Sequence, residues 1–152
     1  MSKVVRKLLL AGTYMGTIGL VGSVLLQIFA RFFLESAPPW TEEASRFFFI
    51  YTMSFSAGLA LESGDFVQLD IVYDRLGSKW KHGLNLLVYG LVAILFLVVG
   101  IYGIQYVKMG WSEKSPSLKV PMAISFISLL VMSFSITYHA ILLLTKQAKA
   151  KK

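Results

Sequence analysis

Charged residues are absent from four long stretches of this 152-residue chain, and that distribution limits what the chain can fold into. Counting histidine as neutral, the stretches are residues 8–30, 47–61, 82–107 and 120–145. A helix needs about 20 apolar residues to cross a hydrocarbon layer of about 30 Å, so three of the stretches qualify without extension. Strands are not expected, because open sheet edges are not tolerated in lipid. Composition agrees, since only 15% of the residues are charged against about 25% in soluble domains.

The second stretch becomes long enough if its helix begins upstream. Pro38 and Pro39 block a helix before that point, and Thr41 is a suitable N-cap. Glu42 and Glu43 then lie in the first turn, where the helix dipole favours carboxylates. We therefore predict an all-α integral membrane protein, a single membrane domain over residues 1–152, with four transmembrane helices at about 8–30, 41–61, 82–107 and 120–145.

A short amphipathic helix is predicted over about residues 67–77, between the second and third transmembrane helices. Leu69, Val72 and Leu76 fall near one helical face, while Asp70 and Asp74 occupy another. This pattern is typical of a helix that lies in the membrane interface. An irregular loop with scattered apolar residues is the alternative.

The basic residues predict how the chain is oriented. Ten of its 15 lysine and arginine residues fall at the two termini and in the middle loop, and five fall in the other two loops. The positive-inside rule therefore places both termini and the middle loop in the cytoplasm. The first apolar run is too long for a signal peptide and lacks a small-x-small cleavage site near Ala30, so we expect an uncleaved first helix.

Several function classes are disfavoured by composition. The chain has no cysteine, which excludes a thiolate metal site, an iron–sulfur centre and a cysteine nucleophile. The centres of the four predicted helices carry no charged residue, which argues against an autonomous proton pump. The net charge of +7 indicates topology and attraction to anionic membrane lipids. No basic face with interleaved aromatics is present, so nucleic acid is not an expected partner. We predict that the chain is not an enzyme.

Two histidines allow one alternative function, because four-helix bundles can hold haem between histidines. His82 lies at the start of the third predicted helix, whereas His139 is about 9 Å deeper in the fourth, at about 1.5 Å per residue. Two axial ligands need nearly equal depth on facing helices. Packed or interfacial histidines are therefore the simpler interpretation, with a membrane anchor of a respiratory enzyme, haem-bearing or haem-free, as the alternative function.

Small residues predict where helices pack closely. Gly12, Gly16 and Gly19 form a stripe on the first helix, of the kind that lets another backbone approach. Ser54 and Gly58 do the same on the second helix. On the last helix Ser128, Ser135 and His139 share a face, and helix packing is again the expected role.

The most specific local motif is Trp40-Thr-Glu-Glu-Ala-Ser-Arg46. Glu42 and Arg46 have the spacing and order of a favourable i,i+4 ion pair, and Glu43 reaches Arg46 at i+3. Trp40 is suited to the membrane interface. An interfacial cap and anchor is the simplest role for this segment.

Together these residues resemble the small membrane subunit of tripartite ATP-independent periplasmic (TRAP) transporters, the DctQ-like family. The resemblance covers essentially the whole chain and rests on Arg31, the Trp40–Arg46 motif, Ala57-Gly58, Gly64-Asp-Phe-Val67 and Asp70. The chain departs from the family near Gly64–Val67, where Glu62, Asp65 and Phe66 stand in place of basic residues and a histidine.

The resemblance implies a function that composition does not indicate. Such subunits sit in the bacterial inner membrane as a fixed scaffold for a large multi-helix subunit, which binds sodium and the solute. A periplasmic solute-binding protein delivers an organic acid such as a sialic acid or a dicarboxylate. The resemblance therefore implies no cofactor in this chain. It implies structural or partner-interface roles for the glycine stripe and for six further residues: Arg31, Trp40, Glu42, Glu43, Arg46 and Asp70.

Overall fold

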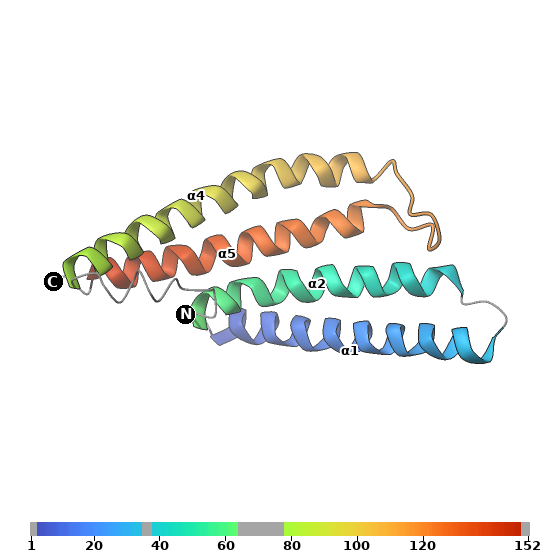
Figure 1. Cartoon of the computed structure of the whole chain (residues 1–152). Helices are drawn as coiled ribbons and strands as arrows, with labels where there is room; N and C mark the ends of the chain where they lie inside the picture. Colours follow the sequence, from blue (N-terminus) through green and yellow to red (C-terminus); the bar gives the residue numbers. More distant parts are fainter. Residues whose placement is uncertain (1–2, 35–37, 64–77, 150–152) are drawn as a thin grey trace.

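The computed structural model describes residues 3–34, 38–63 and 78–149. In these ranges the regular elements are helices and one isolated β-bridge, between Lys114 and Pro121. The helices are α1 (Lys3–Phe33), α2 (Pro39–Ser63), α4 (Ser78–Gly110) and α5 (Ala123–Lys149). They lie lengthwise beside one another, and both chain termini are at the same end (Figure 1). The predicted all-α class is confirmed. The interfacial helix predicted over residues 67–77 lies outside the described residues.

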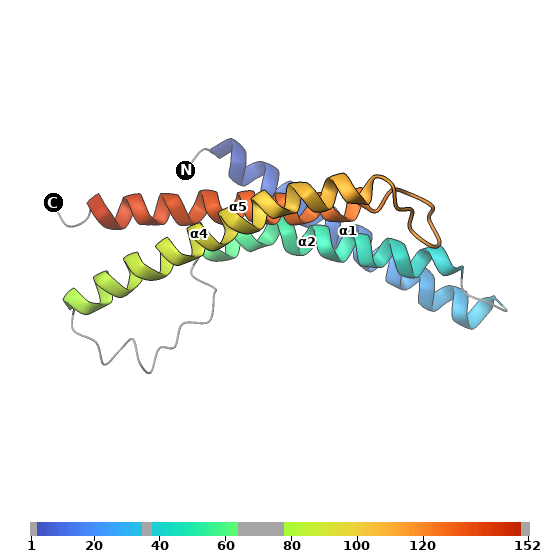
Figure 2. The same cartoon turned by 90° about the horizontal axis from the view of Figure 1, so that it is seen from above.

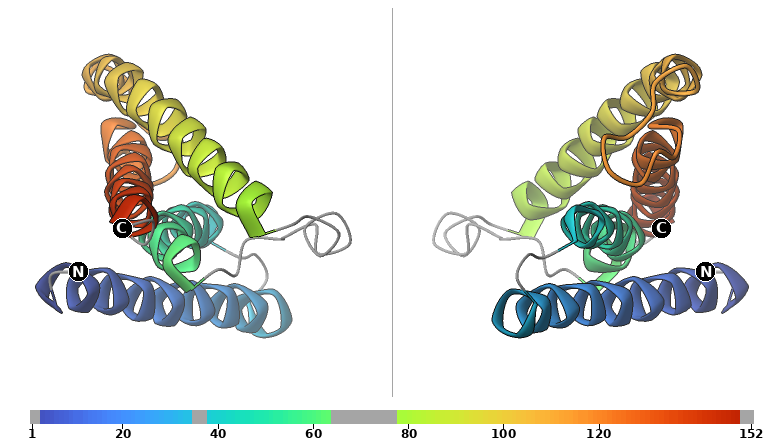
Figure 3. Two further views of the ribbon diagram at one scale, coloured as in Figure 1. Left: turned by 90° about the vertical axis from the view of Figure 1, so that its left-hand side faces the viewer. Right: turned by 90° about the vertical axis from the view of Figure 1, so that its right-hand side faces the viewer.

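The helices form an open row rather than a closed bundle. Helix α1 packs on α2, α2 packs on α5, and α5 packs on α4. The two outer helices cross the central pair at an angle, so that α4 separates from α5 toward the end that carries the termini (Figures 2 and 3). Helices α2 and α5 are therefore the centre of the fold, while α1 and α4 each leave most of their surface uncovered.

Three of these helices are long and apolar enough to cross a membrane: Lys3–Phe33, Trp80–Gly110 and Ala123–Ala148. This differs from the prediction of four, because α2 is not among them. Helix α2 carries Glu42, Glu43 and Arg46 in its first two turns and Glu62 in its last, and it is rich in serine. Helix α2 packs on both α1 and α5, and three of its four buried residues, Thr41, Ser54 and Gly58, are polar or small. A central helix of this kind needs less apolar surface than one that faces lipid on most sides.

All four helix starts differ from the predicted ones: α1 begins at Lys3 instead of 8 and α4 at Ser78 instead of 82, and the other two have a local reason. Helix α2 begins at Pro39, and Thr41 is a buried third residue of the helix rather than its N-cap. The Thr41 hydroxyl donates to the Pro38 carbonyl at 2.8 Å. Proline is suited to the first helical position, since it lacks an N–H that would have no partner there. Helix α5 begins at Ala123 instead of 120, because Pro121 belongs to a bridge with Lys114 in the loop before it.

The glycine stripe of α1 faces α2 within this chain. The buried residues of α1 recur every seven positions, at Leu9, Gly16, Ser23 and Ala30. A Cβ atom added at Gly16 would lie 3.3 Å from the Thr52 backbone, and one at Gly12 would lie 2.7 Å from the Phe55 ring. Gly19 lies against Phe48 in the same way. Small side chains at these positions let the two backbones approach, as expected for helices packing in a membrane.

The contact between α2 and α5 is tighter still, and it is centred on Gly58. A Cβ atom at this position would lie 2.8 Å from His139 Nδ1 and 2.9 Å from the Ser135 carbonyl carbon. Beside this contact, Leu61, Ala93, Ile136 and Ala140 form the buried apolar core that joins α2, α4 and α5. The close approach at Gly58 therefore positions the only core cluster that the described residues contain.

Many serine and threonine hydroxyl groups within these apolar helices donate to the backbone of their own helix. Thr13 donates to the Leu9 carbonyl at 2.9 Å, Ser54 to that of Ile50 at 2.6 Å, and Ser133 to that of Leu129 at 2.8 Å. Such bonds satisfy a polar group where water is absent. The Tyr51 hydroxyl instead crosses between helices, donating to the Ile124 carbonyl of α5 at 2.7 Å.

Replacing Gly58 by alanine should destabilise the protein. The new methyl group would overlap Ser135, and overpacking costs about 1–3 kcal/mol, which exceeds the roughly 1 kcal/mol gained in helix propensity. We expect the melting temperature in detergent to fall by about 2–4 °C for each kcal/mol lost. Gly90→Ala is the matched control, since no atom lies within 4 Å of its added Cβ. Equal melting temperatures for the two variants would contradict the tight α2–α5 contact.

Candidate functional site

Beside the glycine stripe and Arg31 of α1, the candidate residues of the described chain lie at the two ends of α2. The first two turns carry the Trp40–Arg46 motif, and the last two turns carry Gly58 and Glu62. The chain termini and the start of α4 lie near the latter end, and the loop between α4 and α5 lies near the former (Figure 1). We call these the loop end and the terminal end of the molecule.

At the loop end, the predicted Glu42–Arg46 pair is present. Arg46 Nη2 donates to Glu42 Oε1 at 3.1 Å, and the Arg46 and Glu42 side chains are 72% and 67% exposed on the isolated chain. Exposed ion pairs of this kind contribute about 0–1 kcal/mol. The pair therefore stabilises the start of α2 only slightly.

Glu43 does not bind as the sequence suggested. No hydrogen bond or ion pair joins it to Arg46 in the described residues; its Oε2 atom accepts the backbone N–H groups of Ser117 at 2.9 Å and Leu118 at 2.8 Å. These amides lie more than 70 residues away, in the loop between α4 and α5. An i+3 spacing placed Arg46 within reach, but Arg46 pairs with Glu42 instead, and the Glu43 carboxylate accepts two charge-assisted hydrogen bonds from the loop. Glu43 thus connects α2 to the α4–α5 loop.

The loop that Glu43 binds is itself compact. The Ser115 N–H donates to the Val120 carbonyl at 2.8 Å, and the Met122 N–H donates to that of Glu113 at 2.9 Å. Between these bonds Lys119 adopts a positive φ of 58°, a conformation that is uncommon for residues other than glycine. A tight turn of this kind presents the Ser117 and Leu118 amides together to one acceptor.

Arg31 and Trp40 lie at the same end of the molecule, in the last turn of α1 and the first turn of α2. Both side chains are exposed, and in the described part of the chain Arg31 makes no hydrogen bond or ion pair. Trp111 is exposed in the adjoining loop, and Trp80 is exposed at the opposite end. Tryptophans at both ends are typical of membrane-interface positions. Asp70 lies outside the described residues.

At the terminal end, His139 is enclosed between α2 and α5. Its side chain is 1% exposed; Nδ1 lies 2.7 Å from the Ser135 carbonyl oxygen, and Nε2 lies 3.8 Å from Glu62 Oε2. Both ring nitrogens therefore face protein oxygens, which corresponds to a packed histidine. His82, at the start of α4, makes no described contact with it. The Glu62–His139 contact was not predicted, because sequence alone does not tell which face of α2 meets α5.

The long-range contacts of these groups hold separate parts of the chain together. Among residues 3–34, 38–63 and 78–149, no group of three or more histidine or acidic residues could hold a metal ion. The two acidic groups that make long-range contacts, Glu43 and Glu62, each join α2 to another part of the chain. The arrangement fits residues that hold helices in place better than residues that act on a substrate.

Comparison with known proteins identifies what the chain is similar to. Residues 20–150 match the family described as "Tripartite ATP-independent periplasmic transporters, DctQ component". A similar protein is the "Isethionate TRAP transporter permease protein DctMQ" of Oleidesulfovibrio alaskensis, 28% identical over 96 residues, or 62% of this chain. The chain spans 15% of the length of that relative.

Glu43→Gln should loosen the α4–α5 loop. The amide oxygen that replaces the carboxylate is a weaker acceptor, so the Ser117 and Leu118 amides should exchange hydrogen several-fold faster. Hydrogen exchange read by mass spectrometry on the purified chain measures this. Glu42→Gln is the control, since it changes the same charge one residue away and should leave those amides unaffected. Unchanged exchange in Glu43→Gln would show that the carboxylate does not hold the loop.

Proposed function

The chain belongs to the DctQ family of TRAP transporter components, and from that membership we propose that it is the small scaffold subunit of a sodium-coupled importer. The family consists of transporter components rather than enzymes. In this proposal a large multi-helix subunit binds sodium and the solute, and this chain holds part of that subunit in place. The chain itself carries no cofactor in this proposal.

The open row of helices supports a role beside a larger membrane partner. In the membrane-crossing segments of α1 and α4 only 17% and 6% of the residues are buried within the chain. A chain that enclosed its own transport path would be expected to surround charged residues with its helices, whereas here the charged residues of α2 lie at its two ends. The similar DctMQ permease is far longer than this chain, as expected if its remaining length supplies the large subunit.

We further propose an organic acid as the imported solute, delivered by a periplasmic solute-binding protein. Sialic acids and dicarboxylates are the classes that the resemblance implies. The similar permease is described as an isethionate transporter, and isethionate is also a small organic anion. Solute choice would be determined by the binding protein and the large subunit.

The same proposal places the protein in the bacterial inner membrane with all four helices crossing it. Helix α2 has 25 residues and is about 37 Å long at about 1.5 Å per residue, and it runs beside α1 and α5. Its lower hydropathy is compatible with crossing because α1 and α5 shield it from lipid. The terminal end, which carries the basic termini, would face the cytoplasm, and the loop end would face the periplasm.

Reconstitution tests the scaffold role. Proteoliposomes that contain this chain, its large subunit and the periplasmic binding protein should accumulate labelled organic acid under an inward sodium gradient. Vesicles with this chain alone, or without sodium, should not. Sodium-driven uptake by this chain alone would contradict the scaffold assignment.

Cysteine labelling tests the orientation, and the absence of native cysteine makes the background clean. A cysteine at Ser112, which is exposed in the α4–α5 loop, should react with an impermeant maleimide added to intact spheroplasts. A cysteine at Ala148, exposed near the end of α5, should react only after the membrane is permeabilised. The opposite pattern would reverse the proposed topology.

A further inference from the structure

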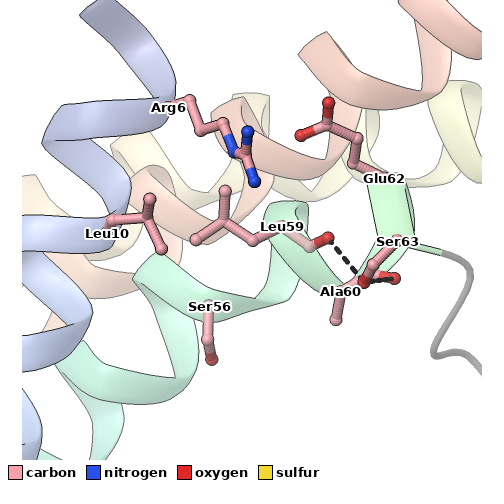
Figure 4. Close-up of a pocket in the computed structure, with 7 residues that line it drawn as sticks. All are labelled: Arg6, Leu10, Ser56, Leu59, Ala60, Glu62 and Ser63. Carbon is pink, nitrogen blue, oxygen red and sulfur yellow. Dashed lines mark hydrogen bonds between the residues drawn. The ribbon is translucent and has the colours of Figure 1, made fainter. Parts of the chain in front are cut away.

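A cavity of about 480 Å³ lies between α1 and α2 at the terminal end. The roles described so far for the glycine stripe and for His139 do not involve this cavity. Its lining residues are Arg6, Leu10, Ser56, Leu59, Ala60, Glu62 and Ser63 (Figure 4). Two of them carry charge of opposite sign, and the wall is otherwise made of leucine, alanine and serine. The cavity therefore offers one cation, one anion and an apolar floor.

The two charged groups project into the same space. Figure 4 shows the Arg6 guanidinium and the Glu62 carboxylate extending from α1 and α2 above Leu10 and Leu59. Within the described residues they form no ion pair with each other, and Arg6 has no hydrogen-bond partner. Glu62 uses Oε2 toward His139 at 3.8 Å, which leaves Oε1 for a ligand. A bound group with one negative and one positive charge could therefore pair with both side chains.

The position of the cavity indicates where such a ligand would come from. Arg6 precedes the uncharged stretch 8–30 and Glu62 follows the uncharged stretch 47–61, so both charges mark one border of the hydrocarbon layer. Arginine at such a border lies at the level of lipid headgroups. Leu10 and Leu59 face the cavity from the hydrocarbon side of the two charges. A ligand that fits must be charged at one end and apolar at the other.

We propose that this cavity binds a zwitterionic phospholipid headgroup, with the lipid phosphate at Arg6 and a primary ammonium at Glu62. Guanidinium groups bind phosphate oxygens strongly, and a primary ammonium supplies N–H donors that a carboxylate accepts. The chemistry corresponds to phosphatidylethanolamine, whose acyl chains continue over the apolar floor. Phosphatidylglycerol has the same phosphate but no cation for Glu62, so the site discriminates between the two lipids. This site is independent of the solute and of the transport role proposed above.

Native mass spectrometry of the full chain tests the proposal. The protein is purified in detergent with equal amounts of phosphatidylethanolamine and phosphatidylglycerol of identical acyl chains, and the retained lipid is counted. We expect about fivefold more retained phosphatidylethanolamine, the ratio that about 1 kcal/mol provides. Glu62→Gln should abolish this preference, whereas Arg6→Gln should weaken retention of both lipids. Equal or greater retention of phosphatidylglycerol by the unaltered chain would overturn the proposal.

Control variants separate the site from general charge. Lys7→Gln removes a neighbouring positive charge that does not line the cavity, and Glu113→Gln removes a negative charge at the loop end. Neither should change the lipid ratio, and a change as large as that of Glu62→Gln would refute a local site. Ser56→Leu fills the cavity with both charges intact and should reduce lipid retention; unchanged retention would also refute it.

A final comparison distinguishes a lipid from a soluble zwitterion of the same chemistry. Glycerophosphoethanolamine, which has the same headgroup without acyl chains, is added to the lipid-loaded chain. We expect no displacement at concentrations equal to the lipid, because the acyl chains contribute most of the buried apolar area. Displacement by the soluble compound at that concentration would assign the cavity to a soluble ligand and overturn the lipid proposal.

Discussion

The rest of this fold depends on the close approach of α2 to the helices on either side. Between membrane helices no hydrophobic driving force favours contact over lipid, so packing and hydrogen bonds must supply it. Gly16 lets α2 approach α1, and Gly58 lets it approach the Ser135–His139 turn of α5. Helix α4 packs mainly on α5, and its Ala93 also belongs to the core cluster that contains Leu61 of α2. If either close contact were lost, the helix beyond it would no longer be held in a fixed position relative to α2.

The two glutamates at the ends of α2 extend this central role. Glu43 binds backbone amides of the α4–α5 loop, and Glu62 lies beside the buried His139 of α5. Neither acid is in the apolar middle of the helix, where a charge would be costly. Helix α2 is thus held at both ends and packed closely along its length. Such an arrangement suits the scaffold role proposed above, because a moving partner can only work against a part that stays fixed.

The uncovered faces of α1 and α4 suit the same role. These outer helices hold most of the exposed large apolar side chains, such as Ile18, Leu25, Leu91 and Ile101. In a membrane such faces meet either lipid or another apolar helix at little cost. In the proposed transporter these two wide surfaces would be available to the large subunit.

By itself the sequence determined that this protein is helical and embedded in a membrane, because charges break its apolar runs only at intervals that match a bilayer. It also identified the glycine stripe, the Glu42–Arg46 pair and the family, since each depends on residues close together along the chain. Only the tertiary structure decided that Glu43 binds the loop near Ser117, that Glu62 meets His139, and that Arg6 and Glu62 share one cavity. Those contacts join residues far apart in sequence, and they depend on how each helix is rotated about its axis. Periodicity constrains that rotation weakly in helices that are apolar on nearly every face, so only their packing determines which side chains meet.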